Sequence, residues 1–192
     1  MKNRQYNISI IILLMESKIY DACATGDEIQ FLQLLKSKNC VPDNKCLTIA
    51  CKYGHMNMVT TIISKTKLRL YDGVRTACKN NQLQIAKKLY RSSMNVNVDQ
   101  HMLDHICYNG YIDVLKWLSV IKTNISEIIN FNCVKMLTTK QHLVMCQWII
   151  DNYSIDMNLT DEKFIFTLIG RNMWDEFKFI IKQCIINKQA KK

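Results

Sequence analysis

Two histidines in the middle of the chain have the spacing of a metal site. His101 and His105 are four residues apart, so on a helix both rings would project from one face, with Asp104 and Cys107 close by. Two ligands at this spacing can grip a zinc ion, but a zinc site needs a third and a fourth ligand in strict geometry. Nothing in the sequence supplies them. We therefore expect surface histidines, with no bound metal and no other cofactor.

Catalytic sequence motifs are also missing. The chain contains no glycine-rich phosphate loop, no G-x-S-x-G elbow and no H-E-x-x-H motif. No nucleophile, base and orienting group can be assembled from its residues. We expect a protein that is not an enzyme and that works by binding another macromolecule.

Nine cysteines are the remaining reactive side chains. Their number is odd and none forms a C-x-x-C pair, whereas a disulfide framework gives even counts in short secreted chains. Free cysteine is among the most buried residue types. We expect small buried thiols in a reducing compartment, and therefore a cytoplasmic protein; a nuclear location would also fit.

Four of these cysteines belong to an internal repeat. Its copies ACATGD, ACKYGH, ACKNNQ and ICYNGY each place a cysteine three residues before a glycine or an asparagine. Both residue types tolerate the left-handed conformation that ends a helix, so this column predicts a tight turn between two helices. The cysteines are Cys23, Cys51, Cys78 and Cys107, and the turn residues are Gly26, Gly54, Asn81, Gly110 and, in two fainter copies, Gln141 and Asn172.

An apolar stripe with helical spacing follows each turn. Its members in the second to fourth copies are Met56, Val59, Ile62 and Ile63; Leu83, Ala86 and Leu89; and Ile112, Leu115 and Leu118. The first copy fits with one inserted residue, giving Ile29, Leu32 and Leu35, and the fainter copies have Leu143, Cys146, Ile149 and Ile150, then Trp174, Phe177, Ile180 and Ile181. Trp117, Trp148 and Trp174 are expected to pack in the core or between helices.

The start of the repeat is marked as well. Asp43, Asp99, Asn130 and Asp161 each lie eleven residues before a turn residue, and they are of the types that cap helix N-termini. Neither helix of a repeat can bury its apolar face alone, so stacking of neighbours must form the core. The expected organisation is a capping segment at 1–15, repeats at 16–42, 43–69, 70–98, 99–129, 130–159 and 160–187, and a basic tail at 188–192.

Composition agrees with an all-α chain. Apolar residues make up 48% of it, and only five glycines and one proline are present to interrupt helices. The net charge of +10 favours acidic or polyanionic partners. The apolar segment Ile8–Met15 is too short to span a bilayer, which needs about 20 residues. It either seals the first repeat or acts as a targeting signal.

The repeats resemble ankyrin repeats. Residues 106–118 (ICYNGYIDVLKWL) are similar to the A-A-x-x-G-H-x-x-x-V-x-x-L-L centre of that family's repeat, and residues 47–55 are similar to the same stretch. Turn spacings of 27 to 31 residues are shorter than the family's repeat of about 33. The resemblance therefore implies an ankyrin-like solenoid with clipped hairpins. Cysteine in the second alanine column resembles ankyrin proteins of large DNA viruses, and for a viral protein the expected location is the host cytoplasm. Tetratricopeptide and HEAT repeats have longer units and different turns.

The resemblance also implies where a partner would bind. Ankyrin-repeat proteins bind through a concave face, which is lined by the residues just before each turn and by the foot of each first helix. We predict that the partner-binding residues are Lys52, Tyr53, Tyr71, Lys79, Asn80, Tyr108, Asn109, Phe131, Lys140 and Arg171. Packed helices would place successive members about 10 Å apart. The alternative is that these lysines and tyrosines only solvate an ordinary surface.

Cations interleaved with aromatic rings suit an acidic, partly apolar protein surface. We expect an adaptor or sequestering protein that is monomeric and binds a protein partner. The alternative function is binding of nucleic acid or another polyanion by the basic face. Salt separates the two, because phosphate-dominated binding weakens steeply as salt rises.

Overall fold

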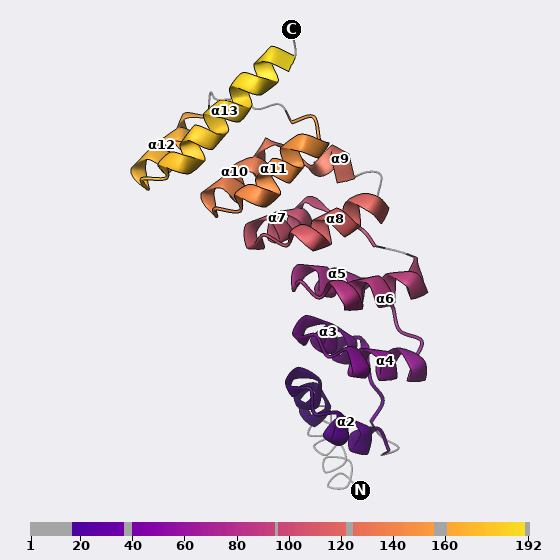
Figure 1. Cartoon of the computed structure of the whole chain (residues 1–192). Helices are drawn as coiled ribbons and strands as arrows, with labels where there is room; N and C mark the ends of the chain where they lie inside the picture. The colour runs from indigo at the N-terminus through magenta and orange to yellow at the C-terminus, as the bar shows by residue number, and fades with distance from the viewer. Residues whose placement is uncertain (1–16, 37–39, 95, 122–124, 156–160, 191–192) are drawn as a thin grey trace, which may run out of the picture. The chain divides into compact units, whose positions relative to one another are not determined.

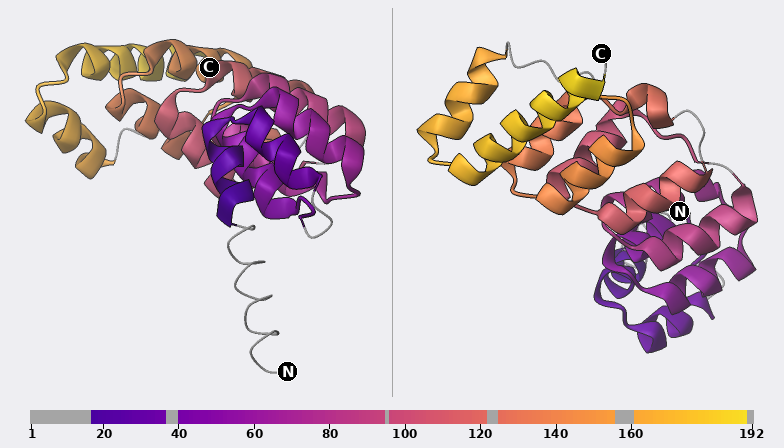
Figure 2. Two further views of the ribbon diagram at one scale, coloured as in Figure 1. Left: turned by 90° about the horizontal axis from the view of Figure 1, so that it is seen from below. Right: turned by 45° about the horizontal axis from the view of Figure 1, so that its top comes forward.

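The computed structural model describes residues 17–36, 40–94, 96–121, 125–155 and 161–190. The expected capping segment 1–15 and the side chains of the expected tail 188–192 lie outside this part. Every regular element in the described ranges is a helix, and the helices come in antiparallel pairs (Figures 1 and 2). The all-α prediction is therefore confirmed for these residues. The chain divides into two compact units, 1–97 and 98–192.

The first unit consists of helix pairs joined by tight turns. Residues 17–25 form a helix that precedes α2 (Glu28–Leu35). The following pairs are α3 (Asn44–Tyr53) with α4 (Met56–Lys65), and α5 (Leu70–Lys79) with α6 (Leu83–Ser93). Helix α3 also packs against α5, so the first helices of successive repeats are neighbours.

The second unit repeats this arrangement. Its pairs are α7 (Gln100–Asn109) with α8 (Ile112–Ile121), α10 (Phe131–Thr139) with α11 (Leu143–Asn152), and α12 (Glu162–Gly170) with α13 (Trp174–Ala190). The short helix α9 (Ile125–Ile128), which the sequence did not predict, lies between α8 and α10 and buries Ile125. We keep the six expected repeat ranges as a proposal for how the helices group.

The turn column is the most accurate part of the sequence prediction. All six expected turn residues have positive φ angles, from 56° at Asn172 to 85° at Gly54. Gln141 also adopts this conformation, at 62°, although a residue with a side chain pays a steric cost there. The tight left-handed turn between the two helices of each repeat is thus confirmed.

Two turn glycines have a second function between repeats. A methyl group added to Gly26 would lie 2.6 Å from Cε1 of His55, and one added to Gly110 would lie 2.7 Å from Nδ1 of His142. Each histidine follows the turn residue of the next repeat. Its Nε2 donates to the carbonyl oxygen two residues before the glycine, at 3.1 Å from Ala24 and 3.3 Å from Tyr108. The missing side chain therefore makes room for a ring that joins two repeats.

The core is built from matching columns of the repeats. The residue four positions before each turn is fully buried in every copy, and so is the cysteine that follows it in the first four copies. The first of these columns consists of Ala22, Ala50, Ala77, Ile106, Leu137 and Leu168. All nine cysteines are free and buried, which confirms the interpretation as small core thiols.

Two expectations for the stripes are wrong. In the first copy Ile29 and Leu32 are 72% and 44% exposed, whereas Phe31 is buried. Phe31 lies five residues after its turn, like the buried Val59 of the second copy, so no residue is inserted. Trp174, the first residue of α13, was expected in the core or between helices but is 49% exposed.

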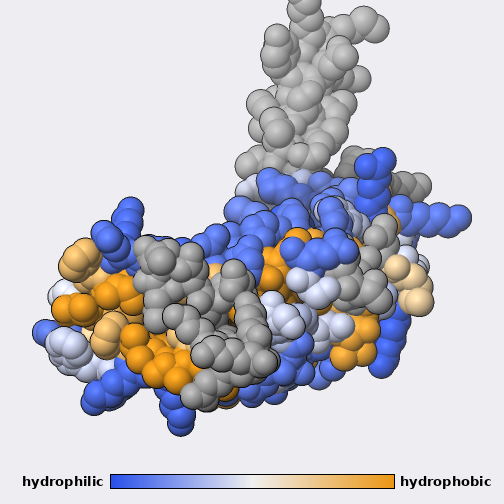
Figure 3. Space-filling model, turned by 90° about the horizontal axis from the view of Figure 1, so that it is seen from above, coloured by the Kyte–Doolittle hydropathy of each residue, from blue (hydrophilic) through white to orange (hydrophobic). Residues whose placement is uncertain are grey.

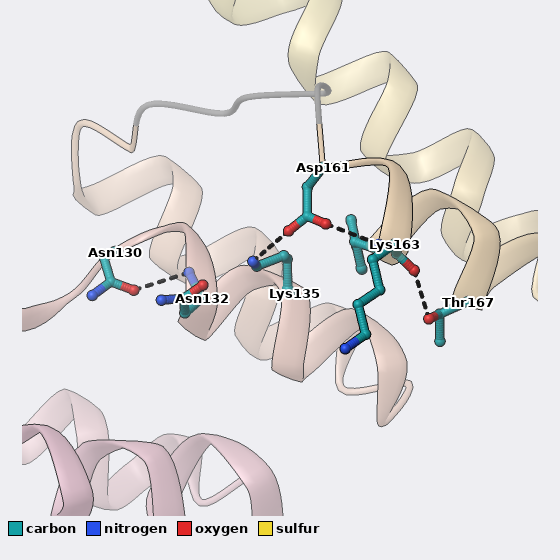
Figure 4. A network of polar contacts seen from close by, with 7 residues as sticks. Asn130, Asn132, Lys135, Asp161, Lys163 and Thr167 are labelled. Atoms are coloured by element: carbon teal, nitrogen blue, oxygen red, sulfur yellow. Dashed lines mark hydrogen bonds and ion pairs between the residues drawn. The ribbon is translucent and has the colours of Figure 1, made fainter.

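The four predicted caps are confirmed, and two of them also connect repeats. The side chains of Asp43, Asp99, Asn130 and Asp161 accept hydrogen bonds from backbone amides in the first turns of α3, α7, α10 and α12. Asp43 also accepts from the Tyr20 hydroxyl at 3.0 Å, and Asp161 from Nζ of Lys135 at 2.7 Å (Figure 4). Tyr20 and Lys135 both lie six residues before the turn of the preceding repeat.

Replacing Lys135 with methionine should raise the pKa of Asp161. The hydrogen bond from Lys135, together with the Phe164 amide, holds the pKa of this carboxyl below its usual value. A lowered carboxyl pKa contributes stability above about pH 4, the unfolded value, and that contribution is lost as pH falls through the folded pKa. In urea unfolding, the excess stability of wild type over Lys135→Met should therefore be smaller at pH 3 than at pH 7. An equal difference at both pH values would contradict this assignment, and Lys65→Met serves as the control.

The cysteines of the first four repeats should react slowly with thiol reagents in the folded protein. Cys23, Cys51, Cys78 and Cys107 are completely buried, and burial raises the pKa of Cys51 and Cys78 to about 12. The thiolate is the reactive form, so both access and ionisation are suppressed. Cys78→Ser should lower the free energy of unfolding by roughly 1 to 3 kcal/mol, because a buried hydroxyl lacks a good partner. Rapid labelling of all four in native buffer, at the rate seen in urea, would contradict the stacked core.

Candidate functional site

In the first unit the predicted binding residues lie at the end of α3 and along α5. Tyr53 is 51% exposed, and the ammonium of Lys52 is 5.2 Å from the centroid of its ring. The same ring stacks on His55 with 6.4 Å between centroids. Tyr71 is half-buried in the first turn of α5. An exposed, supported tyrosine with a cation beside it is thus present at the end of α3.

In the second unit the residues before successive turns meet. Tyr108 ends α7 and is 50% exposed, and Lys140, which follows α10, places Nζ 3.9 Å from the centroid of the Tyr108 ring. This distance is well within the range of a cation–π contact. A hydrogen bond with Lys140 and the charge of its ammonium lower the pKa of the Tyr108 hydroxyl. The two side chains come from residues 32 positions apart, so packing of α7 on α10 creates the pair.

Other predicted residues are engaged in the fold. The side-chain amides of Asn80 and Asn109 donate to the carbonyl oxygens of Thr76 and His105, each at 2.8 Å, and so close the ends of α5 and α7. The ring of Phe131 is half-buried and packs edge to face on Phe164, with 5.9 Å between centroids. These three side chains help to fix the geometry of the repeats, so less of their surface and fewer of their polar atoms are available to a partner.

The two remaining predicted residues are cations. Lys79 is half-buried near the end of α5, and Arg171 is exposed directly after α12. Each lies one or two residues before its turn, in the same column positions as Lys52 and Lys140. We define the pre-turn face of each unit by these residues: Lys52, Tyr53 and Lys79 in the first unit, and Tyr108, Lys140 and Arg171 in the second.

A small hollow lies beside Tyr108. Its volume is about 210 Å³, below the roughly 300 to 1,000 Å³ of a drug-sized cleft, and its lining is His101, Asp104, His105, Tyr108 and Met136. Nε2 of Gln100 donates a hydrogen bond to the Asp104 carboxylate at 2.7 Å, so the carboxylate of this hollow already has a partner on its own helix. Within the described residues, no group of three or more His, Cys, Asp and Glu side chains is placed to hold a metal ion.

The sequence pointed to four of the five residues that line this hollow, but we did not predict that they lie together. The spacing of His101, His105 and Tyr108, by four and then three residues, would have placed all three on one helix face. Met136 was missed because it comes from the next repeat, and no sequence signal links it to α7.

Comparison with known proteins identifies the architecture. No family model and no curated protein sequence matches the chain. Among solved structures, the ankyrin repeat domain of human ASB11 is similar, with a TM-score of 0.55 and 15% sequence identity, over 71% of this chain and 69% of that one. The chain therefore has the ankyrin-repeat fold, as the sequence resemblance implied. No helix in the described ranges is long and apolar enough to cross a membrane.

Proposed function

We propose that this ankyrin-repeat chain is an adaptor or sequestering module that binds an acidic, partly apolar protein through its pre-turn face. The observation that carries this is the pair in the second unit: a half-exposed Tyr108 ring with the Lys140 ammonium 3.9 Å from its centroid. Lys52 and Tyr53 form a similar pair in the first unit. Ankyrin repeats generally serve protein–protein interaction, which supports a protein as the partner.

The chemistry of these pairs favours a carboxylate beside an apolar group. A tyrosine ring offers a large contact area at little cost in conformational entropy. The adjacent ammonium is already held in place, so a partner carboxylate can meet it while an apolar side chain covers the ring. We take the binding species to be a monomer without metal or cofactor, and its nine free thiols favour the cytoplasm.

Photocrosslinking tests this function directly. The photoreactive residue p-benzoylphenylalanine replaces Tyr108 in one variant and Val120, an exposed residue of α8, in the control. Irradiation in an extract of the native cells should give protein adducts from position 108 that position 120 does not give. Identical adducts from both positions would contradict binding at the pre-turn face.

Polyanion binding is the second candidate, and the net charge of +10 favours it. Raising salt from about 50 to about 200 mM would weaken a complex with several phosphate contacts roughly a thousandfold or more. A tyrosine-anchored protein complex should lose much less affinity. If only nucleic acid is recovered, and its binding shows the steep salt dependence, the partner is a polyanion and not a protein.

A further inference from the structure

Helix α13 has two neighbouring apolar faces, one buried and one partly exposed. Its inner side buries Ile180 and Cys184 within the second unit. On its outer side, Trp174, Phe177, Ile181 and Ile185 follow one another at spacings of three, four and four residues, which keeps them on one helix face. Trp174 and Ile185 are about half exposed, at 49% and 53%, and the Trp174 ring packs edge to face on Phe177. A helix whose apolar surface extends well beyond the face that it buries is usually covered there as well.

Equivalent positions in the preceding repeats show what such a face contacts. The residue six positions after the turn is Lys116 in α8, and its Nζ lies 5.9 Å from the Trp148 ring centroid in α11. The same position in α11 is Gln147, whose side-chain oxygen accepts from Nε2 of Gln183 in α13 at 2.8 Å. In both repeats this position therefore contacts the second helix of the following repeat. The equivalent residue in α13 is Lys178, which is exposed on the outer side.

The outer side also has a distinct charge pattern. A shallow groove of about 350 Å³ runs along it, lined by Phe177, Ile181, Ile185 and Ile186 with Lys178 and Lys182 beside them. In Figure 3, hydrophobic side chains gather on this end of the second unit, with hydrophilic ones around them. Among the described residues no carboxylate lines the groove. Within the described residues, Lys178 forms one long ion pair, at 4.0 Å, with Asp175 on its own helix, and both side chains are largely exposed.

We infer that the outer face of α13 is a second docking site, which takes an amphipathic helix of a partner protein whose apolar stripe is flanked by carboxylates. The incoming helix would occupy the place that a following second helix takes on α8 and on α11. Its carboxylates would pair with Lys178 and Lys182. A second copy of this chain fits less well, because it would bring two further lysines to the edges of the same apolar contact. This site is independent of the pre-turn face.

Two synthetic peptides of about 18 residues, which span about 27 Å as helices, test this docking. Both carry leucines at alternating spacings of three and four residues, one with glutamates on the flanks and the other with lysines. Fluorescence anisotropy with the full chain should show the glutamate peptide binding at least about tenfold more tightly, since complementary charge decides between otherwise equal partners. Ile185→Glu should weaken both peptides, and circular dichroism checks that this variant is folded.

Charge reversal separates local pairing from the overall positive charge. The double variant Lys178→Glu with Lys182→Glu should reverse the preference, so that the lysine peptide binds more tightly. The matched control, Lys65→Glu with Lys67→Glu in the first unit, has the same net charge and should keep the original preference. Equal binding of the two peptides, or the same response of both double variants, would overturn the site. So would a dimer in sedimentation velocity that Ile185→Glu abolishes, because the occupant would then be a second copy.

Discussion

Gly110→Ala is expected to lower the free energy of unfolding by roughly 2 to 3 kcal/mol. The backbone at Gly110 has a φ of 70°, and an L-residue with a side chain costs about 1 to 2 kcal/mol in that region. The added Cβ would also lie 2.7 to 2.9 Å from ring atoms of His142. Moving that ring breaks its hydrogen bond to the Tyr108 carbonyl oxygen, so the substitution disturbs both the turn and the contact between repeats.

Gly170→Ala is the matched control, and its effect should have the opposite sign. Gly170 is the last residue of α12, and a Cβ added there meets nothing within 4 Å. Alanine loses less conformational freedom on folding than glycine, which stabilises a helix by up to about 0.5 to 1 kcal/mol. Urea unfolding of the two variants measures both values. Loss of stability in both, or in neither, would contradict the role assigned to the turn column.

Tyr108→Ala should weaken binding of the protein partner by about 2 kcal/mol, or roughly thirtyfold, if the residue is a central anchor. Tyr53→Ala should have an effect of the same kind in the first unit. Tyr108→Phe keeps the ring under Lys140 and loses only the hydroxyl, so its effect should be several times smaller. Calorimetric titration with the purified partner measures all three. Thermal stability should hardly change, because neither tyrosine lies in a buried column.

The lysines should act differently from the tyrosines. Lys79→Glu is expected mainly to slow association, since a charge at the rim of an interface steers a partner more than it holds it. Lys140→Glu should do this and also speed dissociation, because the same ammonium is in contact with the Tyr108 ring. Surface plasmon resonance separates the two rates. Equal effects of both substitutions on dissociation would contradict a special role for the Tyr108–Lys140 pair.

The turns and caps could be predicted because their backbone chemistry restricts which residues fit. A positive φ favours glycine or asparagine, and the N-cap of a helix favours aspartate or asparagine. Each preference therefore places similar residues at equivalent positions of successive repeats. The first stripe was misplaced because apolar residues are frequent in α2, and Ile29, Leu32 and Leu35 match a helical spacing as well as Phe31 does. The distance from the turn, five residues, would have given the correct face.

The candidate site was harder to predict than the fold. Their positions just before a turn identified Tyr108 and Lys140 separately. The contact between them depends on packing between residues 32 positions apart. A different, local effect explains why Asn80 and Asn109 were predicted to be available to a partner. Their amides instead bond carbonyl oxygens four residues earlier, and a local competition of this kind leaves no distinct pattern in the sequence.

The dissociation constant of the purified partner for one combined variant tests binding at the pre-turn face most directly. That variant carries Tyr53→Ala, Tyr108→Ala, Lys79→Glu and Lys140→Glu, and circular dichroism and thermal unfolding confirm that it is folded. Binding weaker than wild type by roughly a hundredfold or more is expected, from two lost anchors and reversed steering charges. A partner that binds the folded variant as tightly as it binds the wild type would show that the pre-turn face is not the binding site.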